Sequence, residues 1–336
     1  MPSIKFSVII NNYNYGDFLE ESINSVLLQK YQDIELIVVD DGSKDHSRQI
    51  IEKYQDQLIS IFKENGGQAS ALNLGFYYSK GDIILFLDAD DCLYPHAIYQ
   101  MATCFVAEKI VKCHGKLKII DDKSKAKNYV VPTEELSEGN LCSLILKYGP
   151  ESYVCPPTSG NAWSRSFLEK VLPIPENEYR TSADAYLFTL APLFGNIAKV
   201  KSCIGMYRIH DTNNYWQNNF SLDKLNNDII RYESRVKILE KYAKKLGFDV
   251  NPEDWKKNNR YYLARLDLRS RLNKSYISSY PVLICIYSVI NSKIKLHKKI
   301  LWIIWFFAVR HSPKLFIVQL GKLFFNLKMR IKLAEE

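Results

Sequence analysis

The sequence predicts an α/β fold with a mostly parallel sheet flanked by helices, followed by a C-terminal helical extension. Four short apolar segments rich in β-branched residues occur in about the first 100 residues, and segments with a helical spacing of apolar residues separate them. Polar clusters follow three of the four apolar segments. Ligands of parallel sheets bind at the carboxyl ends of the strands, so these clusters mark a candidate site.

The four strands are expected to be buried on both faces, because their apolar residues form continuous runs. The helices between them are predicted from apolar residues that recur three and four positions apart. Ser43 or Asp45 can cap the second helix. In chain order the strands cover residues 6–10, 35–39, 58–62 and 83–87, and the helices cover residues 17–30, 46–57, 68–79 and about 95–107.

Residues 110–210 have a less regular pattern. Residues 111–121 are expected to form a pair of strands, and residues 150–165 a loop, because they contain two consecutive prolines and a Ser-Gly-Asn sequence. A helix is predicted to start near Ser182, and residues 221–247 are predicted to form a longer amphipathic helix.

The chain carries its positive charge at one end. Residues 271–336 contain 12 Lys and Arg against 2 Asp and Glu, whereas the other residues contain 33 against 35. The near-neutral body argues against a protein that binds nucleic acid, and the basic end predicts an anionic partner.

Residues 275–332 are basic and amphipathic. Two apolar runs, 281–290 and 300–309, are separated by lysines, and neither reaches the roughly 20 apolar residues that a membrane span needs. Together with Trp302 and Trp305, these runs favour helices that lie in the interface of a membrane. A helical cap on the preceding domain, or a dimer contact, is the alternative.

Seven cysteines have an irregular spacing and include no Cys-x-x-Cys motif, so we expect reduced thiols and no zinc site. The apolar run at residues 6–10 is too short for a signal peptide, and no small-residue cleavage site follows it. These features predict a cytoplasmic protein that is peripheral on the inner face of the cell membrane.

The sequence Asp88-Ala89-Asp90-Asp91 follows the fourth apolar segment. Carboxylates two positions apart at the end of a strand can reach one ion together, and their oxygens suit Mg²⁺ or Mn²⁺. Such an ion neutralises charge on a departing diphosphate. A solvated acidic turn is the alternative.

Two further polar segments precede this one. Asp40-Asp41-Gly42-Ser43 follows the second apolar segment, and a carboxylate there can accept a hydrogen bond from N3–H of uracil or thymine. A helix cap would use the same residues. Residues 65–75 begin with Asn-Gly-Gly and continue into a helix with small residues, which would let that helix approach the sheet closely.

Together, in this order and spacing, these segments resemble the family 2 glycosyltransferases, which bind nucleotide sugars with a GT-A fold. The resemblance implies a GT-A, Rossmann-like domain over residues 1–215, with a nucleotide-sugar half at 1–105 and an acceptor half at 106–215, and a helical extension over 216–336. The segments that carry it are Ser7-Val8-Ile9-Ile10 with Tyr13-Asn14, Val39-Asp40-Asp41-Gly42-Ser43, Asn65-Gly66-Gly67 through Asn73-Leu74-Gly75, and Gly81-Asp82 through Asp91.

The resemblance also implies roles at the donor site. Tyr13 would stack on or flank the base, and Asp41 or Asp40 would read a pyrimidine. Asp90 would be the main ligand of the metal, with Asp88 beside it, and Asp91 could share that role. The residues assigned to the donor are Tyr13, Asp40, Asp41, Gln68, Asn73, Asp88 and Asp91.

Thr181-Ser182-Ala183-Asp184 matches the position of the family's catalytic base. Asp184 would take the proton of the acceptor hydroxyl as that oxygen attacks C1 of the sugar from the face opposite the diphosphate. A carboxylate that only stabilises the first turn of its helix is the alternative. His210 would touch the diphosphate or the metal, and Trp163 and Arg165 would line the acceptor site.

Three features depart from the family pattern. Asn11-Asn12 stands where the family has a proline before Tyr-Asn, and Ala183 replaces an acidic residue or glycine before the base. No Gln-x-x-Arg-Trp motif occurs, which argues against a processive polymerase.

The resemblance therefore implies an inverting, metal-dependent glycosyltransferase that uses a UDP- or dTDP-sugar. The basic amphipathic tail suggests that the acceptor is a lipid-linked or cell-surface glycan. A degenerate homologue that only binds nucleotide or membrane is one alternative. A phosphatase of the haloacid dehalogenase type is another, although Cys92 stands where that class has Thr or Val. A sugar nucleotidyltransferase would need a Gly-rich loop after the first strand, which residues 11–16 do not provide.

Overall fold

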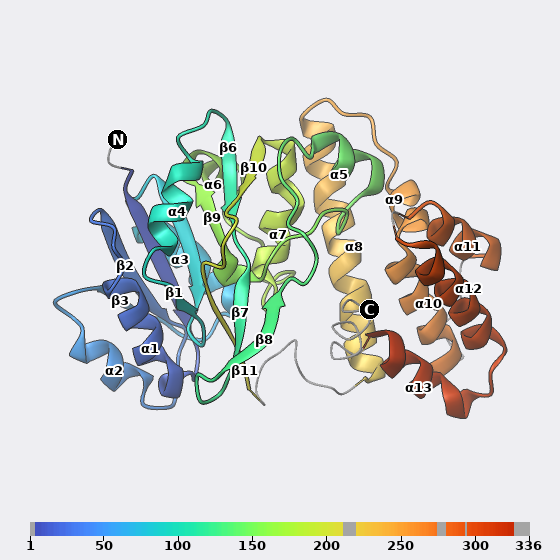
Figure 1. Ribbon diagram of the computed structural model, residues 1–336, viewed down its shortest axis with the longest axis horizontal. Helices are drawn as coiled ribbons and strands as arrows, with labels where there is room; N and C mark the ends of the chain where they lie inside the picture. The colour runs from blue at the N-terminus through green and yellow to red at the C-terminus, as the bar shows by residue number, and fades with distance from the viewer. Residues whose placement is uncertain (1–3, 211–219, 274–279, 293, 326–336) are drawn as a thin grey trace. The chain divides into compact units, whose positions relative to one another are not determined.

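The computed structural model describes residues 4–210, 220–273, 280–292 and 294–325 (Figure 1). The chain forms two compact units. The first comprises the chain up to Ser143 together with Tyr153–His210, and the second comprises Leu144–Ser152 and the chain after His210.

The first unit is built on a seven-stranded sheet in the order β10-β6-β9-β4-β1-β2-β3. Strand β9 is antiparallel to β4 and β6, and the other neighbours are parallel. The mostly parallel sheet predicted from the sequence is therefore confirmed. The strands are β1 (Phe6–Asn12), β2 (Ile34–Asp40), β3 (Ile59–Phe62), β4 (Ile83–Asp88), β6 (Ile110–His114), β9 (Asn161–Ser164) and β10 (Asn196–Lys199).

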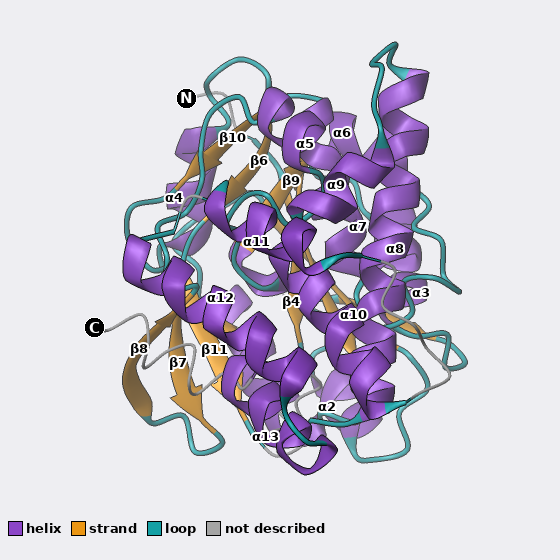
Figure 2. Cartoon of the chain, turned by 90° about the vertical axis from the view of Figure 1, so that its right-hand side faces the viewer, coloured by secondary structure: helices purple, strands orange, loops and turns teal. Residues whose placement is uncertain are grey.

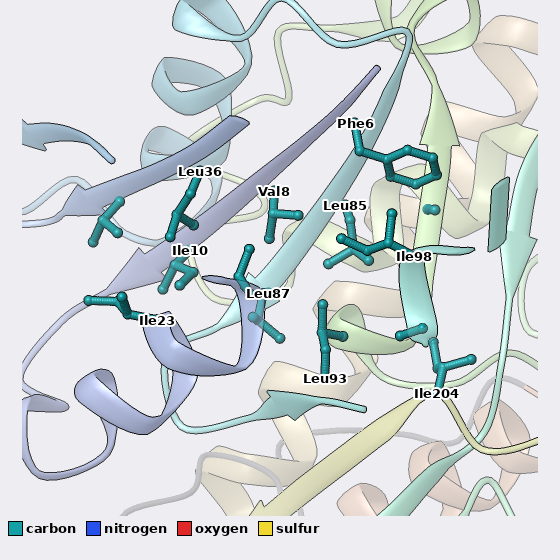
Figure 3. Close-up of a cluster of buried hydrophobic side chains, with 14 of the residues drawn as sticks. Phe6, Val8, Ile10, Ile23, Leu36, Leu85, Leu87, Leu93, Ile98 and Ile204 are labelled. Atoms are coloured by element: carbon teal, nitrogen blue, oxygen red, sulfur yellow. The ribbon is translucent and has the colours of Figure 1, made fainter. Parts of the chain in front are cut away.

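Helices follow each of the first four sheet strands, as the apolar spacing predicts. They are α1 (Gly16–Leu27), α2 (Ser47–Lys53), α3 (Gln68–Tyr78) and α4 (Ala97–Cys104). Figure 3 shows one face of the sheet, where Val8, Ile10 and Leu87 pack with Ile23 of α1 and Ile98 of α4. These side chains have no exposed area, which confirms that the strands are buried.

Helix α3 packs against β1 and β2 through a glycine. A Cβ atom at Gly75 would lie 2.4 Å from Cγ2 of Ile9 and 3.3 Å from Cγ2 of Val39. A larger residue would therefore push the helix off the sheet. The close approach expected of this small-residue helix is confirmed.

A second, four-stranded sheet has the order β5-β11-β7-β8. The strand pair expected within residues 111–121 is wrong, because β6 and β7 are there but belong to different sheets. Strand β7 pairs with β8 and β11 instead, and β11 pairs with β5, which follows the acidic turn after β4. The strands are β5 (Cys92–Leu93), β7 (Leu117–Asp121), β8 (Ala126–Val131) and β11 (Gly205–Ile209).

Short helices connect the later strands. The segment expected as a loop at residues 150–165 contains both the 3₁₀ turn η1 and the core strand β9, which the Pro and Gly signals conceal. The remaining helical segments before residue 210 are α5 (Cys142–Tyr148), η1 (Thr158–Gly160), α6 (Arg165–Val171), α7 (Ala183–Leu190) and η2 (Ala191–Leu193).

The second unit is helical in its described residues (Figure 2). The long helix expected over 221–247 is confirmed as α8, and Ser221 caps it by accepting a hydrogen bond from the Lys224 N–H. Helix α10 packs against α8, α11, α12 and α13. The helices are α8 (Leu222–Lys245), α9 (Pro252–Asn258), α10 (Arg260–Leu272), α11 (Val282–Ile290), α12 (Leu296–His311) and α13 (Lys314–Phe325).

Two tryptophans that the sequence assigned to a membrane interface lie inside this unit. Trp302 is 7% exposed and Trp305 is 1% exposed. Trp305 donates from Nε1 to the Leu320 carbonyl at 3.1 Å, which fixes it between α12 and α13. That part of the expectation is wrong, because both rings form the core of the helical unit.

An ion pair also holds this core. Arg310 donates from Nε and Nη2 to the two carboxylate oxygens of Asp267, at 2.7 and 2.8 Å, and Asp267 is 1% exposed. A bidentate pair of this kind fixes α12 against α10. Within the described residues, no helix combines the length and the apolar character that crossing a membrane requires.

Candidate active site

The polar clusters predicted from the sequence meet at the carboxyl edge of the central sheet. In the parallel register, Asn11 of β1 is the partner of Asp88 of β4, and Asn12 is the partner of Asp40 of β2. Asn11 Nδ2 donates to Asp88 Oδ1 at 3.1 Å, and Asn12 Nδ2 donates to Asp40 Oδ1 at 2.7 Å. The two asparagines that replace the family's proline therefore fix the two acidic segments. Tyr13, which follows them, is 44% exposed.

Asp41 organises the loop that precedes α3. Its Oδ1 accepts from Lys63 Nζ at 2.6 Å and from the Gly66 N–H at 2.9 Å. Its Oδ2 accepts from the Gly67 N–H at 2.7 Å and from Asn65 Nδ2 at 3.1 Å. Four donors fill the acceptor positions of one carboxylate, and Asp41 is only 3% exposed. The contacts of this aspartate therefore hold the Asn-Gly-Gly loop in place.

Asp88 lies at the end of β4 among other carboxylates. Burial and, to a lesser extent, the charges of Asp90 and Asp184 together raise the pKa of Asp88 to about 7. Hydrogen bonds from Asn11 and from Gln68 Nε2, the latter at 3.1 Å, act in the opposite direction. A carboxyl group in this setting gains from a nearby cation, because a positive charge favours its ionised form.

Asp90 and His210 face each other. Nε2 of His210 lies 2.9 Å from Oδ2 of Asp90, and the two side chains are 6% and 10% exposed. The imidazole packs between aromatic rings, at 4.8 Å from the Phe18 centroid and 5.4 Å from the Tyr15 centroid. Strand β11 carries His210 to this position, so a residue 120 positions away in sequence joins the acidic motif.

Asp91 has a different environment from Asp90. It is fully buried, its Oδ2 accepts from Ser159 Oγ at 2.6 Å, and its Oδ1 accepts from the Arg208 N–H at 2.9 Å. Burial raises the pKa of Asp91 well above its usual value, with added effects from Asp90 and Asp88. The structure thus separates two aspartates that the sequence leaves equivalent: Asp91 is a structural anchor.

Asp184 lies in the first turn of α7. Thr158 Oγ1 donates to Asp184 Oδ2 at 3.2 Å. The next residue, Ser159, donates to Asp91 and accepts from the Asp88 N–H at 3.1 Å. Two consecutive residues of η1 therefore contact both the acidic motif after β4 and the expected catalytic base.

Gln68 makes a second link between the same two groups. Its Nε2 donates to Asp88, and its Oε1 accepts from the Ala183 N–H at 3.1 Å. The backbone adds a hydrogen bond of 2.7 Å from the Gln68 N–H to the Arg180 carbonyl. Because Ala183 contributes its backbone N–H, the loss of the family's acidic side chain at this position leaves the link intact.

Three predicted site residues lie elsewhere. Asn73 exchanges hydrogen bonds with the backbone of Ile174, at 2.9 and 2.8 Å, and so holds α3 to the chain before α7. Trp163 is 1% exposed and stacks on Phe188 in the core. Arg165 donates to the Gly81 carbonyl at 2.6 Å, at the amino end of β4, opposite the acidic motif. The structure does not bring these three side chains to the carboxyl edge of the sheet.

Arg208 is a residue of the site that the sequence did not indicate. Its guanidinium is fully buried, donates to the Asp90 carbonyl at 2.8 Å and pairs with Glu21 at 2.5 Å. Its backbone N–H holds Asp91. The only sequence signal for it is its place in the segment that ends at His210, two residues after Arg208. Only the topology of the folded chain reveals this residue, because β11 belongs to a different sheet from the strands that carry the acidic motif.

The described residues contain no group of three or more His, Cys, Asp and Glu side chains arranged around one metal position. The pair formed by Asp90 and His210, with Asp88 two residues before Asp90, nevertheless offers oxygen and nitrogen ligands. That donor set suits Mn²⁺ or Mg²⁺ when a diphosphate completes the coordination.

Comparison with known proteins places the chain among the glycosyltransferases. The family model for glycosyl transferase family 2 matches residues 7–157. An uncharacterized glycosyltransferase of Nostoc sp. is 39% identical over 216 residues, which is 63% of this chain and 67% of the relative.

Solved structures with low identity have the same fold. S. aureus TarS 1-349 in complex with UDP-GlcNAc has a TM-score of 0.55 at 17% identity, covering 98% of this chain and 92% of that one. The mannosyltransferase PcManGT from Pyrobaculum calidifontis, in complex with GDP-Man and Mn2+, has a TM-score of 0.50 at 12% identity, covering 98% and 86%. The mixed sheet with its C-terminal helices is thus a GT-A glycosyltransferase fold. On its sequence match and its fold, the chain belongs to glycosyltransferase family 2.

Proposed function

We propose that this enzyme transfers a sugar from a UDP- or dTDP-sugar to a hydroxyl of a lipid-linked or cell-surface glycan, with inversion at C1. The observation that carries the proposal is the double link between the acidic motif and Asp184, through Gln68 and through Thr158–Ser159. A transferase needs its leaving-group site and its base in a fixed relation, because a single displacement uses both at once.

The donor is proposed to bind along the carboxyl edge of β1, β2 and β4. Tyr13 is exposed there and would flank the base, while Asp40 and Asp41 follow β2 nearby. The resemblance assigns the pyrimidine N3–H to Asp41 or Asp40. Because four protein donors already occupy Asp41, we propose Asp40, which accepts from Asn12 Nδ2 and the Ser43 N–H. TarS, a structural relative, has been solved with UDP-GlcNAc, which supports a UDP-sugar as the first donor to test.

We propose Asp90 as the main ligand of a divalent cation, with His210 and Asp88 beside it. The 2.9 Å contact between Asp90 and His210 supports this assignment, and the Mn2+ of PcManGT supports the choice of ion. We do not propose Asp91 as a ligand of the cation, because its two oxygens accept hydrogen bonds from Ser159 Oγ and the Arg208 N–H. The bound cation would neutralise charge on the diphosphate as it leaves.

In the proposed reaction Asp184 acts as the general base. The acceptor oxygen forms its bond to C1 while the bond from C1 to the diphosphate oxygen breaks, and the hydroxyl proton goes to Asp184. The N-terminal position of Asp184 on α7 favours its negative charge before transfer. Attack opposite the leaving group inverts the anomeric centre.

The helical unit is proposed to bind an anionic membrane surface on the cytoplasmic side. Leu296, Ile300, Ile304 and Phe307 are exposed and recur at helical spacing on α12, and Leu283, Tyr287 and Ile290 do the same on α11. Three lysines of the same unit are also exposed: Lys295 directly before α12, and Lys314 and Lys322 on α13. An apolar stripe with basic neighbours suits the headgroup region of such a membrane. A lipid-linked acceptor would then be within reach of the enzyme.

A thermal-shift panel tests the proposal first. UDP, dTDP, GDP and ADP are each added with and without Mn²⁺ to wild type and to Asp90→Ala. We expect a rise in Tm with one pyrimidine diphosphate that requires the metal and is lost in the variant, because a ligand stabilises the state that binds it. The absence of any shift would favour the alternatives in which the chain does not bind these nucleotides: a degenerate homologue that only binds membrane, or a phosphatase. Stereochemical analysis of the product by NMR tests inversion.

A further inference from the structure

Lys112 is a buried charged residue that the proposed mechanism does not use. It lies on β6 and has no exposed area. Its Nζ has no hydrogen-bond partner within the described part of the chain. A buried amine without a partner is costly, so its position calls for a compensating interaction.

Three aromatic rings surround the amine. Nζ lies 4.5 Å from the centroid of Phe188, 5.1 Å from that of Tyr153 and 5.2 Å from that of Trp163. The Tyr153 hydroxyl donates to the Phe188 carbonyl at 2.7 Å, which fixes two of the rings to each other. The faces of such rings attract a cation, so this cage favours the protonated amine.

The cage connects Lys112 to the proposed base. Phe188 lies four residues after Asp184 on α7, so both side chains are on the same side of that helix. Burial is the main cause that lowers the pKa of Lys112, to about 8, and the neighbouring carboxylate of Asp184 is among the groups that act in the opposite direction. The amine therefore stays mostly protonated at neutral pH.

Asp184 lies one turn before Phe188 in α7, and Thr158 Oγ1 donates a hydrogen bond to its carboxylate. The ammonium over the Phe188 ring therefore lies on the side of α7 that carries Asp184, where a cation attracts the carboxylate.

We propose that Lys112 is a positioning residue of the transfer reaction, whose buried ammonium acts as the counter-charge that keeps the carboxylate of Asp184 ionised and oriented. The inference rests on the proposed role of Asp184 as the base. During transfer the acceptor proton passes to Asp184, and Lys112 keeps its own proton throughout. His114, on the same strand, adds no competing charge, because burial holds its pKa well below the usual value.

The first test measures the coupling between the two side chains without any substrate. Thermal unfolding at pH 7.5 is compared for wild type, Lys112→Met, Asp184→Asn and the double variant. Removing an uncompensated buried charge stabilises a protein. The increase in Tm caused by Lys112→Met should therefore be larger in the Asp184→Asn background than in wild type, by about 2–4 °C. Additive Tm changes would overturn the proposal, whatever the enzyme's substrate.

The second test measures catalysis. Release of UDP or dTDP is followed with UDP-GlcNAc, UDP-glucose, UDP-galactose and dTDP-glucose in the presence of Mn²⁺, with water as the acceptor whose oxygen takes the sugar and whose proton goes to Asp184. We expect Lys112→Met to lower kcat by about 10-fold or more with KM for the donor within about two-fold, and to lose nothing further when Asp184 is already Asn. Lys112→Gln serves as the second variant if Lys112→Met does not fold.

The outcomes separate the two proposals. If Asp184→Asn keeps wild-type kcat, the assignment of Asp184 as the base fails. The non-additivity of the Tm changes then still shows whether Lys112 and Asp184 interact as a charge pair. If Asp184→Asn lowers kcat by several orders of magnitude but Lys112→Met and Lys112→Gln do not, only the role of Lys112 fails. Lys118→Met, on β7, is the control for removing a lysine from the next strand along the chain and should leave kcat unchanged.

Discussion

Gln68 donates a hydrogen bond of 3.1 Å to Asp88, and the other end of the same amide accepts from the first residue of the helix that carries Asp184. One side chain thus bridges the end of β4 and the start of α7. The Gln68 amide fixes the position of one element relative to the other, and because it is neutral it places no extra charge between the carboxylates of Asp88 and Asp184.

Replacing Gln68 tests this bridge. Gln68→Ala should lower kcat by about 10- to 100-fold while the Tm falls by only a few degrees, because the variant loses two hydrogen bonds of ordinary strength but also the alignment of base and donor. Gln68→Glu should be at least as impaired, since it faces Asp88 with a like charge. Steady-state kinetics of both variants provide the measurement. Wild-type kcat in Gln68→Ala would contradict the bridging role.

The two adjacent aspartates should respond in opposite ways to substitution. Asp90→Ala should abolish the metal-dependent Tm shift with nucleotide and should cost the free protein less stability than Asp91→Ala, because removing Asp90 also relieves its repulsion with Asp88 and Asp91. Asp91→Ala should destabilise the protein by about 2–3 kcal/mol, because it leaves the Ser159 hydroxyl and the Arg208 N–H without their acceptor. Urea unfolding and nucleotide titration, run side by side, distinguish the two. Similar behaviour of both variants would refute the division of roles.

Gly67 provides a test of the loop before α3 with a matched control. Its φ is +89°, and a Cβ atom there would lie 2.4 Å from Cγ and 2.6 Å from the carbonyl oxygen of Arg180. Gly139 has the same φ of +89°, and nothing lies within 4 Å of its missing Cβ. Gly139→Ala should cost about 1 kcal/mol for the backbone alone, and Gly67→Ala about 1–3 kcal/mol more for the clash.

The measurement is the free energy of unfolding in urea, combined with UDP binding. We expect Gly67→Ala to weaken nucleotide binding, since the loop that Asp41 holds must move away from Arg180. Equal costs for the two glycine variants would show that the approach of Arg180 is not tight.

The first half of the fold could be predicted from the sequence because its signals are local. The β1, β2 and β4 strands are continuous apolar runs, and their ends carry the polar residues that form the site. The antiparallel strand β9 could not, because Pro156, Pro157 and Gly160 read as a loop while the residues after them pair with β4 and β6. Such a strand forms because of contacts with residues that are distant in the sequence.

The same distinction applies to the site. Asp88, Asp90 and Asp184 are recognised by motif, but whether Asp90 or Asp91 is available depends on Ser159 and Arg208, which are 68 and 117 residues from Asp91. The inward position of Trp302 and Trp305 likewise depends on contacts with Tyr261 of α10 and with the Leu320 carbonyl of α13, which no local pattern reveals. From composition alone, the same two tryptophans are expected to lie at a membrane interface.

The helical unit gives a prediction about membranes with its own control. Leu296 is 74% exposed at the start of α12, and Leu28 is 71% exposed after α1 in the first unit. Leu296→Asp should weaken co-sedimentation with phosphatidylglycerol vesicles several-fold, because a carboxylate replaces apolar contact on a basic face. Leu28→Asp should have no effect. Equal binding by both variants and wild type would remove the support for membrane association through α12.

The pH dependence of stability should report the buried amine. The pKa of Lys112 is about 8 in the folded chain against an ordinary value of 10.5, so between these values the unfolded chain binds more protons. Stability therefore rises with pH across this window, relative to a protein without the amine. Below about pH 8 the full cost of burying the charge is present, about 3 kcal/mol, and it is lost as the pH approaches about 10.5.

Lys112→Met should accordingly be more stable than wild type by roughly this amount at pH 7.5, with the difference shrinking through pH 9 and 10. Other groups that titrate in this range are common to both proteins and cancel in the comparison. Urea unfolding at the three pH values measures the difference. A constant difference would mean that the amine titrates normally, and a cage of aromatic rings would then suffice to hold its charge without Asp184.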